Sequence, residues 1–371
     1  AGTTLNILAV VTPQFKSYEL RDEEFESLTG ITVNWTHIPF VALQEKIASV
    51  GVAADGSFDV VNYLDSWGPA NAYWLESIDG WLKRDGISMD RYPEAFKKSA
   101  MFKGETLGFP LRAHPMLMFY RKDLFAKHGL SVPKTWNDVA SAGKTIKQKE
   151  GIGGLACYFG ADGNRQNLFL WLNYIWATGT EVFDKQMKPA WATPSGLRAT
   201  RDYVSLHTKH NICGKGAVSN VEQDGRIQFA QGNAAMMPVW WWAYSGFYNP
   251  NQSKLTKDQV GFAGMPSYQG KTVTYAISMP YSISKYSKNK EASWEFMKWL
   301  SNPELDRRNA IERSVRGEKI VNNVVTHKSS MADLGVNAAN DNIQMAALAS
   351  LANSDIMPQI PEWPEIGDLL S

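Results

Sequence analysis

Residues 103–136 read KGETLGFPLRAHPMLMFYRKDLFAKHGLSVPKTW and carry the turn, strand and helix-start signals that decide the fold. Lys103–Glu105 is typical of a turn between two short extended segments, and Pro110 is predicted to end the second of them. Met116–Tyr120 is predicted to be a further strand. Thr135, followed three residues later by an aspartate, has the spacing of a capping box and predicts a helix directly after it.

The chain before this stretch alternates between strand and helix patterns. Leu5–Val11 is a short apolar run typical of a buried parallel strand, and Ile31–Trp35 and Phe58–Tyr63 are predicted to be the next two strands. Thr12–Tyr18 is predicted to be a polar loop, and Glu19–Thr29 a helix that a glycine ends. Strand–helix–strand order predicts a parallel sheet with right-handed crossovers. We therefore expect the loops after the strands to line one wall of a ligand-binding crevice.

The rest of the chain carries helix patterns of two kinds. Leu168–Ala177 is apolar throughout, which indicates a buried helix, whereas Lys290–Leu300 has apolar residues at helical spacing and is predicted to be amphipathic. Phe229–Met237 is rich in small residues, and Gly232 is expected to break a helix before an apolar strand. Together these patterns indicate an α/β fold. Because no Gly/Ser linker is present, we expect the chain to cross between domains several times.

Length, charge and hydropathy narrow the class of protein. A chain of 371 residues exceeds the roughly 250–300 residues over which one hydrophobic core grows, so two lobes are expected. The net charge of +1, without any Lys/Arg block, argues against nucleic acid and anionic membranes as partners. No apolar run approaches the ~20 residues that span a bilayer. Strand-like sequence begins close to Ala1, as expected for a mature exported protein or a trimmed chain.

The sequence lacks the signatures of catalysis and of cofactor binding, so we expect no catalytic residue, no metal and no cofactor. His207 and His210 have a spacing that a metal site could use, but without further ligands nearby we interpret them as a solvated helix end. Cys157 and Cys213 match no zinc or redox spacing, and they could pair in an oxidising compartment or be two buried thiols. Aromatic residues form 12% of the chain, with Trp over-represented, which suits a protein that presents flat apolar faces to a sugar.

Several motifs occur in the order in which they occur in a known family. One series consists of residues 103–110 (KGETLGFP), 118–125 (MFYRKDLF), 129–130 (GL) and 133–136 (PKTW). Further motifs are residues 25–33 (FESLTGITV), 58–61 (FDVV), 229–236 (FAQGNAAM) and 287–300 (SKNKEASWEFMKWL). Each motif alone is weak, but in this order and along the whole chain they resemble extracellular solute-binding protein family 1.

The resemblance implies an α/β protein with the two-lobed periplasmic-binding-protein fold (type II, Venus-flytrap), each lobe being a mainly parallel sheet flanked by helices. It implies a lobe I of residues 1–111 and 266–313 and a lobe II of residues 114–262 and 317–371, with hinges near 111–113, 263–272 and 313–317. It also implies an exported monomer, periplasmic or extracellular and membrane-anchored, that delivers a sugar or sugar alcohol to the permease subunits of a bacterial ABC importer. In such proteins the ligand stabilises the closed form and so shifts an existing open–closed equilibrium.

Residues 5–20 (LNILAVVTPQFKSYEL) and 248–253 (YNPNQS) are also similar to the polyol-binding branch of this family. That branch carries acidic residues at the position of His114 and near Val239. Carboxylates are good hydrogen-bond partners for pairs of hydroxyl groups. Because this sequence lacks these two carboxylates, another sugar or a sugar acid is an alternative ligand. A carbohydrate-active enzyme is a further alternative, because the 37 acidic residues cannot be paired from the sequence.

Several regions of the chain are expected to contact the ligand. Two regions follow predicted strands of the first lobe. One further region lies at the first crossover and another at the third. A polar cluster follows a Gly-rich turn, and the remaining predicted residues are aromatic. If Trp240–Trp242 continue a strand, at most two of the three rings face one way. The predicted ligand-binding residues are Thr12, Gln14, Phe15, Asp65, Trp67, Arg112, His114, Asn164, Arg165, Gln166, Asn167, Trp240, Trp241, Trp242, Tyr244, Tyr275 and Arg316.

Overall fold

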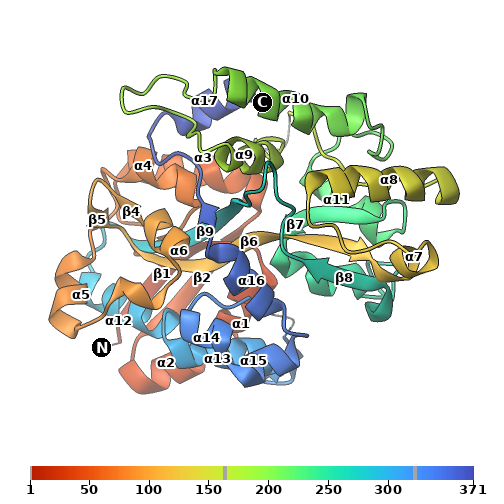
Figure 1. Cartoon of the computed structure of the whole chain (residues 1–371). Coiled ribbons are helices and arrows are strands. Elements are labelled where there is room, and N and C mark those ends of the chain that lie inside the picture. Colours follow the sequence, from red (N-terminus) through yellow and green to blue (C-terminus); the bar gives the residue numbers. More distant parts are fainter. Residues whose placement is uncertain (1, 162–164, 321–323) are drawn as a thin grey trace. The chain divides into compact units, whose positions relative to one another are not determined.

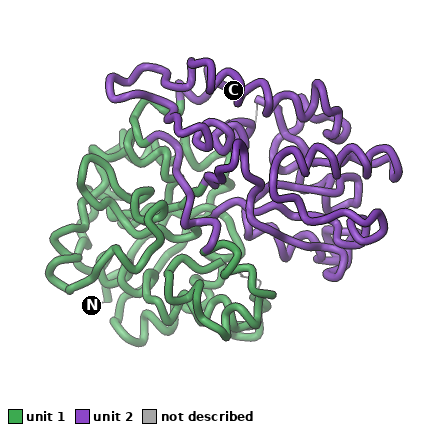
Figure 2. Tube along the Cα trace, viewed as in Figure 1, with its two compact units in different colours: residues 1–114, 276–348, 359–364 green, residues 115–275, 349–358, 365–371 purple. Residues whose placement is uncertain are grey.

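The computed structural model describes residues 2–161, 165–320 and 324–371 (Figure 1). They form two compact units, each assembled from separate stretches of the chain (Figure 2). Unit 1 contains the chain up to His114, Ala276–Leu348 and Gln359–Pro364; unit 2 contains Pro115–Tyr275, Ala349–Pro358 and Glu365–Ser371. Residues 317–348, which the sequence resemblance assigns to lobe II, thus cluster with unit 1.

The sheet of unit 1 has β1 (Thr4–Val10) between two parallel neighbours. β2 (Thr32–Ile38) pairs with β1 along its whole length, and β3 (Val60–Asn62) pairs with β1 on the other side. The parallel order predicted for these three strands is confirmed. β9 (Thr274–Ile283) continues the sheet as an antiparallel neighbour of β3. All ten residues of β9 are buried, as expected for a strand covered on both faces.

Two short helices follow β1 where the sequence predicts a loop and one helix. The segment predicted to be a polar loop is instead α1 (Pro13–Glu19), because Thr12 caps its first turn and Pro13 needs no N–H partner there. The predicted helix of residues 19–29 begins only at α2 (Asp22–Thr29). It ends as predicted at Gly30, whose φ of 71° favours glycine.

The long amphipathic helix predicted near the C-terminal third is confirmed as α12 (Lys290–Leu300). Its Phe296 and Trp299 rings lie 5.4 Å from the ring of Phe25 on α2, so an aromatic cluster holds the two helices together. The other elements of unit 1 are α3 (Phe40–Ala53), η1 (Asp65–Trp67), α4 (Gly68–Asn71), α5 (Asp79–Asp85), η2 (Met89–Arg91), α6 (Glu94–Ser99), β4 (Met101–Phe102), β5 (Glu105–Thr106), α13 (Pro303–Ile311), β10 (Ser314–Val315), β11 (Glu318–Lys319), α14 (Lys328–Ala332) and α15 (Leu334–Ala339).

The strands of unit 2 pair mainly in the antiparallel sense. β6 (Phe109–Arg121) pairs with β7 (Met236–Trp240) and with β8 (Val260–Ala263), both antiparallel. Parallel pairing occurs in this unit between β12 (Ser354–Asp355) and the start of β9, and at isolated bridges. The predicted strand of residues 116–120 is confirmed as part of β6, but Pro110 does not end an extended segment, because it lies inside this strand.

Two helices of unit 2 form where the sequence predicts them. Thr135 and Asp138 form the predicted capping box at the start of α8 (Trp136–Glu150). The predicted apolar helix is α9 (Leu168–Ala177), and all ten of its residues are buried. The remaining elements are α7 (Lys122–Lys127), α10 (Pro194–Thr208), α11 (Glu222–Ala230), η3 (Trp241–Tyr248) and η4 (Lys257–Gln259), together with α16 (Ile343–Leu351) and α17 (Trp363–Leu370), which both include residues of each unit.

Cys157 and Cys213 form a disulfide, which settles the alternative that the sequence leaves open. Leu155 bridges Cys213 in the same region, so the bond fastens two backbone segments that already pair. Within the described ranges, none of the helices is both long enough and apolar enough to cross a membrane.

Candidate functional site

The loop after β1 is the first predicted ligand-binding region, and the structure turns it into the start of α1. Thr12 Oγ1 accepts a hydrogen bond from the backbone N–H of Phe15 at 3.2 Å, so the hydroxyl of Thr12 serves as the helix cap. The Phe15 ring is buried and meets the ring of Tyr281 edge-on, with 4.9 Å between centroids. Gln14 lies between these two residues in the first turn of α1 and is also buried.

Arg112 reaches Gln14 from the first crossover. Its Nε donates a hydrogen bond to Gln14 Oε1 at 2.8 Å, and its Nη1 donates to the Sδ of Met279 at 2.9 Å. The φ of Arg112 is 50°, in the left-handed region that a residue with a bulky side chain seldom adopts. Such strain is often found at functional sites, where the surrounding structure holds the backbone in place.

His114 lies two residues beyond Arg112 and is buried. Burial, assisted by the positive charge of Arg112, holds the pKa of His114 well below its usual value of 6.5. The imidazole is therefore neutral at pH 7, and it can hydrogen-bond to a ligand without adding positive charge to that of Arg112.

The loop after β3 supplies Asp65 and Trp67, which lie in η1 rather than in a loop. Asp65 is completely buried, and its two oxygens accept backbone hydrogen bonds from Ser66 at 2.6 Å and Ser278 at 3.1 Å. Burial raises the pKa of the Asp65 carboxyl to about 7, against the opposing effect of these hydrogen bonds. The Trp67 ring is buried and stacks on Phe40 at 5.6 Å, and its Nε1 has no hydrogen-bond partner within the described part of the chain.

One short segment of β9 brings these three regions together. Ser278 contacts Asp65, Met279 contacts Arg112, and Tyr281 contacts Phe15. All three regions therefore contact the same short segment of β9, and the Arg112–Gln14 hydrogen bond joins the segment after β1 directly to the first crossover. Ser278–Tyr281 is not among the predicted ligand-binding regions, because nothing in the sequence of a buried strand marks a site.

The polar cluster before α9 has partners inside unit 2. Asn164 lies outside the described residues. Arg165, buried and with a φ of 65°, donates from Nη1 to Asp368 Oδ1 at 2.8 Å. Asn167 donates to the backbone carbonyl of Ser371 at 2.9 Å, and Gln166 Oε1 accepts from the backbone N–H of Glu222 at 3.0 Å. This cluster thus contacts both α17 and the start of α11.

The three consecutive tryptophans do not continue one strand, so the prediction of alternating faces is wrong. β7 ends at Trp240, and Trp241 begins η3, in which about three residues complete a turn and side chains point in three directions. Trp240 packs against Phe169 and Tyr275, each at 5.1 Å, whereas Trp241 is fully buried.

The other predicted aromatic residues of unit 2 lie in its core. Tyr244 packs against Phe119 and Phe262 on the β6–β8 side. Tyr275 is buried, and its backbone N–H donates to Asn173 Oδ1 at 2.6 Å.

Arg316 lies apart from the residues gathered around Ser278–Tyr281. It sits with a φ of 52° in the turn between β10 and β11 and pairs with Glu23 on α2 at 2.8 Å. Both side chains are more than half exposed, so this contact is a surface ion pair.

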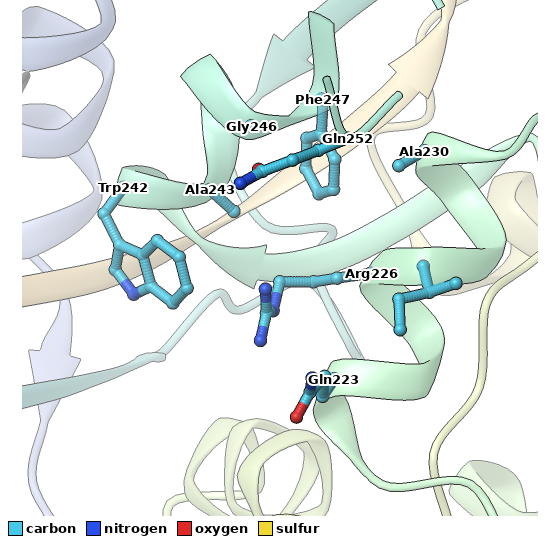
Figure 3. Close-up of a pocket in the computed structure, with 9 residues that line it drawn as sticks. Gln223, Arg226, Ala230, Trp242, Ala243, Gly246, Phe247 and Gln252 are labelled. Carbon is cyan, nitrogen blue, oxygen red and sulfur yellow. The ribbon is translucent and has the colours of Figure 1, made fainter. Parts of the chain in front are cut away.

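Trp242 borders a cavity of about 270 Å³ in unit 2 (Figure 3). The face of α11 that carries Gln223, Arg226 and Ala230 forms one side of this cavity, and η3 forms the other. Gln252 completes the rim. The α11 residues are not among the predicted ligand-binding residues, although their spacing of three and four positions places them on one helix face. Within residues 2–161, 165–320 and 324–371, no group of three or more His, Cys, Asp or Glu side chains could hold a metal ion.

Comparison with known proteins places the chain in a family. The profile of the bacterial extracellular solute-binding proteins matches residues 11–306. A binding protein of Brucella abortus is 27% identical over 92% of this chain and 79% of its own length, and the mannitol-binding protein of Pseudomonas aeruginosa is 26% identical over 75% of this chain and 64% of its own length. An ABC transporter solute-binding protein of Agrobacterium radiobacter K84, solved with ribitol, is 26% identical and superposes with a TM-score of 0.81 over 100% of this chain and 92% of its own. The chain has the fold of these proteins and belongs to the bacterial extracellular solute-binding protein family.

Proposed function

We propose that this protein binds a sugar or sugar alcohol for a bacterial ABC importer and delivers it to membrane permease subunits. The observation that carries the proposal is the meeting of Gln14 and Arg112 beside the Ser278–Tyr281 segment. An amide and a guanidinium offer acceptor and donor groups to hydroxyl pairs. The relatives described as binding mannitol and ribitol support this class of ligand.

Four of the ligand-binding residues predicted from the sequence are proposed to have two different roles. Gln14 and Arg112 are proposed to hydrogen-bond the ligand directly. Asp65 and Thr12 are proposed to hold the surrounding backbone, because their oxygens already accept N–H groups of the chain. Ligand binding is proposed to favour a closed arrangement of the two lobes, in the sense of a population shift.

A sugar acid is the second candidate ligand, and Arg112 is the observation that favours it. The side-chain partner that accepts from its Nε is the neutral amide of Gln14. A ligand carboxylate gains a charge-assisted hydrogen bond from a guanidinium, which a neutral hydroxyl does not. Binding of an acid that weakens sharply with added salt would support this candidate.

The proposal includes export, a monomeric state and the absence of any chemical conversion of the ligand. Family membership supports an extracellular or periplasmic location. Incubation with oligosaccharides should release no new reducing ends if the protein only binds its ligand. New reducing ends would instead support a carbohydrate-active enzyme.

A thermal-shift screen over sugars, polyols and sugar acids tests the proposed function. A ligand that binds the folded state raises the melting temperature by mass action, and a ligand at about 100 times its Kd adds about 2.7 kcal/mol. We expect at least one neutral sugar or polyol to raise the melting temperature, and titration calorimetry then gives its Kd. A screen in which no member of these three classes binds would contradict the proposal.

A further inference from the structure

A cluster of one tryptophan, one histidine and two carboxylates joins α1, α2 and β2 in unit 1 (Figure 1). Trp35 and His37 alternate along β2, and their rings stack in parallel, with 5.6 Å between centroids and 2° between planes. The indole Nε1 of Trp35 donates to both oxygens of Asp22, at 3.1 and 2.9 Å. His37 Nε2 lies 3.2 Å from Glu19 Oε2. The ring stack thus contacts the last residue of α1 and the first residue of α2.

The Asp22 carboxyl is partly buried and faces charges of both signs. Burial raises its pKa to about 7, against the opposing effect of the hydrogen bond from Trp35. The negative charge of Glu19 raises this pKa further, whereas the positive charges of Arg316 and Lys16 lower it. The other side chains of the first turns of α2 have their own partners: Glu23 pairs with Arg316, Glu24 with Arg21 and Arg308, and Phe25 with the rings of α12. Asp22 therefore changes its charge near neutral pH.

The cluster holds the end of α1 that lies opposite the candidate site. α1 has only seven residues, with Gln14 in its first turn and Glu19 as its last residue. At 1.5 Å per residue these two positions are about 7.5 Å apart along the helix, so a shift of one end displaces the other. Tyr281 gives a second connection, because its ring meets both Phe15 of α1 and Trp35 edge-on, at 4.9 and 6.5 Å. The contacts of the cluster therefore bear on the position of Gln14.

We propose that the contact between Asp22 and Trp35 is a pH-sensitive anchor of the α1–α2 corner, and that ligand affinity falls as Asp22 loses its proton. The inference rests on the proposed function, because it assigns a regulation to the same site. Protonated Asp22 accepts the Trp35 N–H without placing a second negative charge near Glu19.

Ionised Asp22 carries a charge in partly buried surroundings, which weakens the anchor. The folded-state pKa lies above the ordinary value of 3.8, so the stabilisation that this group contributes at low pH is lost as the pH rises to about 7. The anchor is therefore tight in mildly acidic solution and loose in mildly alkaline solution.

The first test follows the indole N–H resonance of Trp35 by NMR of the full chain without ligand, between about pH 5 and about pH 9. Trp35→Phe lacks this N–H and so identifies the resonance. The resonance should titrate near pH 7 in the wild type and in His37→Gln. It should not titrate in Asp22→Asn, which keeps the shape of the side chain and an oxygen that accepts the N–H. A resonance that does not titrate in the wild type, or that stops titrating only in His37→Gln, would overturn the inference.

The second test measures calorimetric Kd values at about pH 6 and about pH 8 for mannitol, ribitol and any other compound that the thermal-shift screen identifies. The wild type should bind about fivefold more weakly at the higher pH, the lower end of ordinary coupling between two sites. Asp22→Asn should lose most of this difference and keep the tighter Kd at both pH values. Because Asp65 also has a raised pKa, the comparison of Asp22→Asn with the wild type carries the test.

A matched control removes an exposed aspartate of the same unit. Asp55 Oδ1 accepts the backbone N–H of Ser57 at 2.8 Å, and Asp55→Asn changes the net charge of the protein by the same amount as Asp22→Asn. This variant should keep the wild-type dependence of Kd on pH. An equal loss of the dependence in both variants would mean that net charge, and not the cluster, sets it.

The two tests separate the inference from the proposed function, because the Trp35 titration needs no ligand. If the wild type binds a sugar or polyol and Asp22→Asn has the same dependence of Kd on pH, the inference is wrong while the proposed function stands. If no compound binds, the proposed function and the effect of pH on affinity are both wrong, whatever the Trp35 resonance shows.

Discussion

Gln14 accepts a hydrogen bond from the Nε of Arg112 at 2.8 Å, although 98 positions separate the two residues in the chain. Gln14 lies in the first turn of α1, and Arg112 lies in β6 with a left-handed backbone. The pair therefore joins the end of β1 to the last residues of unit 1 before the chain enters unit 2. A ligand that hydrogen-bonds to Gln14 and Arg112 therefore contacts both of these segments.

Replacement of Gln14 by alanine should weaken ligand binding and leave the fold largely intact. The change removes one hydrogen-bond acceptor, and we expect a loss of about tenfold in affinity, equivalent to about 1.4 kcal/mol. Titration calorimetry with the ligand found by the thermal-shift screen measures the Kd of the variant and of the wild type. Gln186→Ala, which removes an exposed glutamine of unit 2, is the matched control and should bind as the wild type does. Equal affinities of Gln14→Ala and wild type would remove Gln14 from the site.

The buried carboxyl of Asp65 should make the protein less stable as the pH rises. Its pKa is raised from 3.8 to about 7, so between these values the folded state binds more protons than the unfolded state. The free energy of unfolding attributable to this group therefore falls as the pH rises from about 4 to 7. Urea unfolding at several pH values should show a flatter pH dependence for Asp65→Asn than for wild type. Parallel pH profiles of the two proteins would contradict the raised pKa.

Reduction of the Cys157–Cys213 disulfide should destabilise the protein. The bond closes a segment of 56 residues, and loss of such a cross-link commonly costs about 2–4 kcal/mol, because the unfolded chain gains freedom. Urea unfolding with and without a reductant measures the difference. The Cys157→Ala/Cys213→Ala double variant should match the reduced wild type and should not respond to reductant.

The Arg165–Asp368 pair should matter more than an ordinary surface ion pair. Asp368→Ala leaves the buried guanidinium of Arg165 without this carboxylate, and we expect a loss of about 1 kcal/mol or more in the free energy of unfolding. Glu304→Ala, which breaks an exposed pair, should cost less than about 0.5 kcal/mol. Equal losses in the two variants would show that burial of Arg165 adds nothing.

Elements with a strong periodic or capping signal could be predicted from the sequence, and elements set by tertiary contacts could not. Thr135 begins α8 and Gly30 ends α2 because these signals act within a few residues. α1 differs from the predicted loop, because a polar stretch that begins with Pro13 resembles a loop in sequence, whereas Thr12 caps a helix there. η3 differs from the predicted strand, because a short run of aromatic residues is compatible with either structure.

For the candidate site, strand order predicts which loops lie close together but not which atoms each side chain contacts. Gln14 and Arg112 are brought together as expected. The oxygens of Asp65, in contrast, accept hydrogen bonds from the backbone N–H groups of Ser66 and Ser278. Ser278 lies in a strand more than two hundred residues later, so this contact is not visible in the local sequence.

Val60 of β3 pairs with Ile283 of β9, so β3 is synthesised long before its antiparallel neighbour. At a synthesis rate of roughly 5–20 residues per second, β3 leaves the ribosome roughly 10–45 s before its neighbour β9 exists. During that interval the growing sheet of β1, β2 and β3 presents an unpaired edge, which is a template for wrong pairing with other chains. Until Ile283 has been synthesised, the edge of β3 that pairs with β9 in the finished fold therefore has no partner strand.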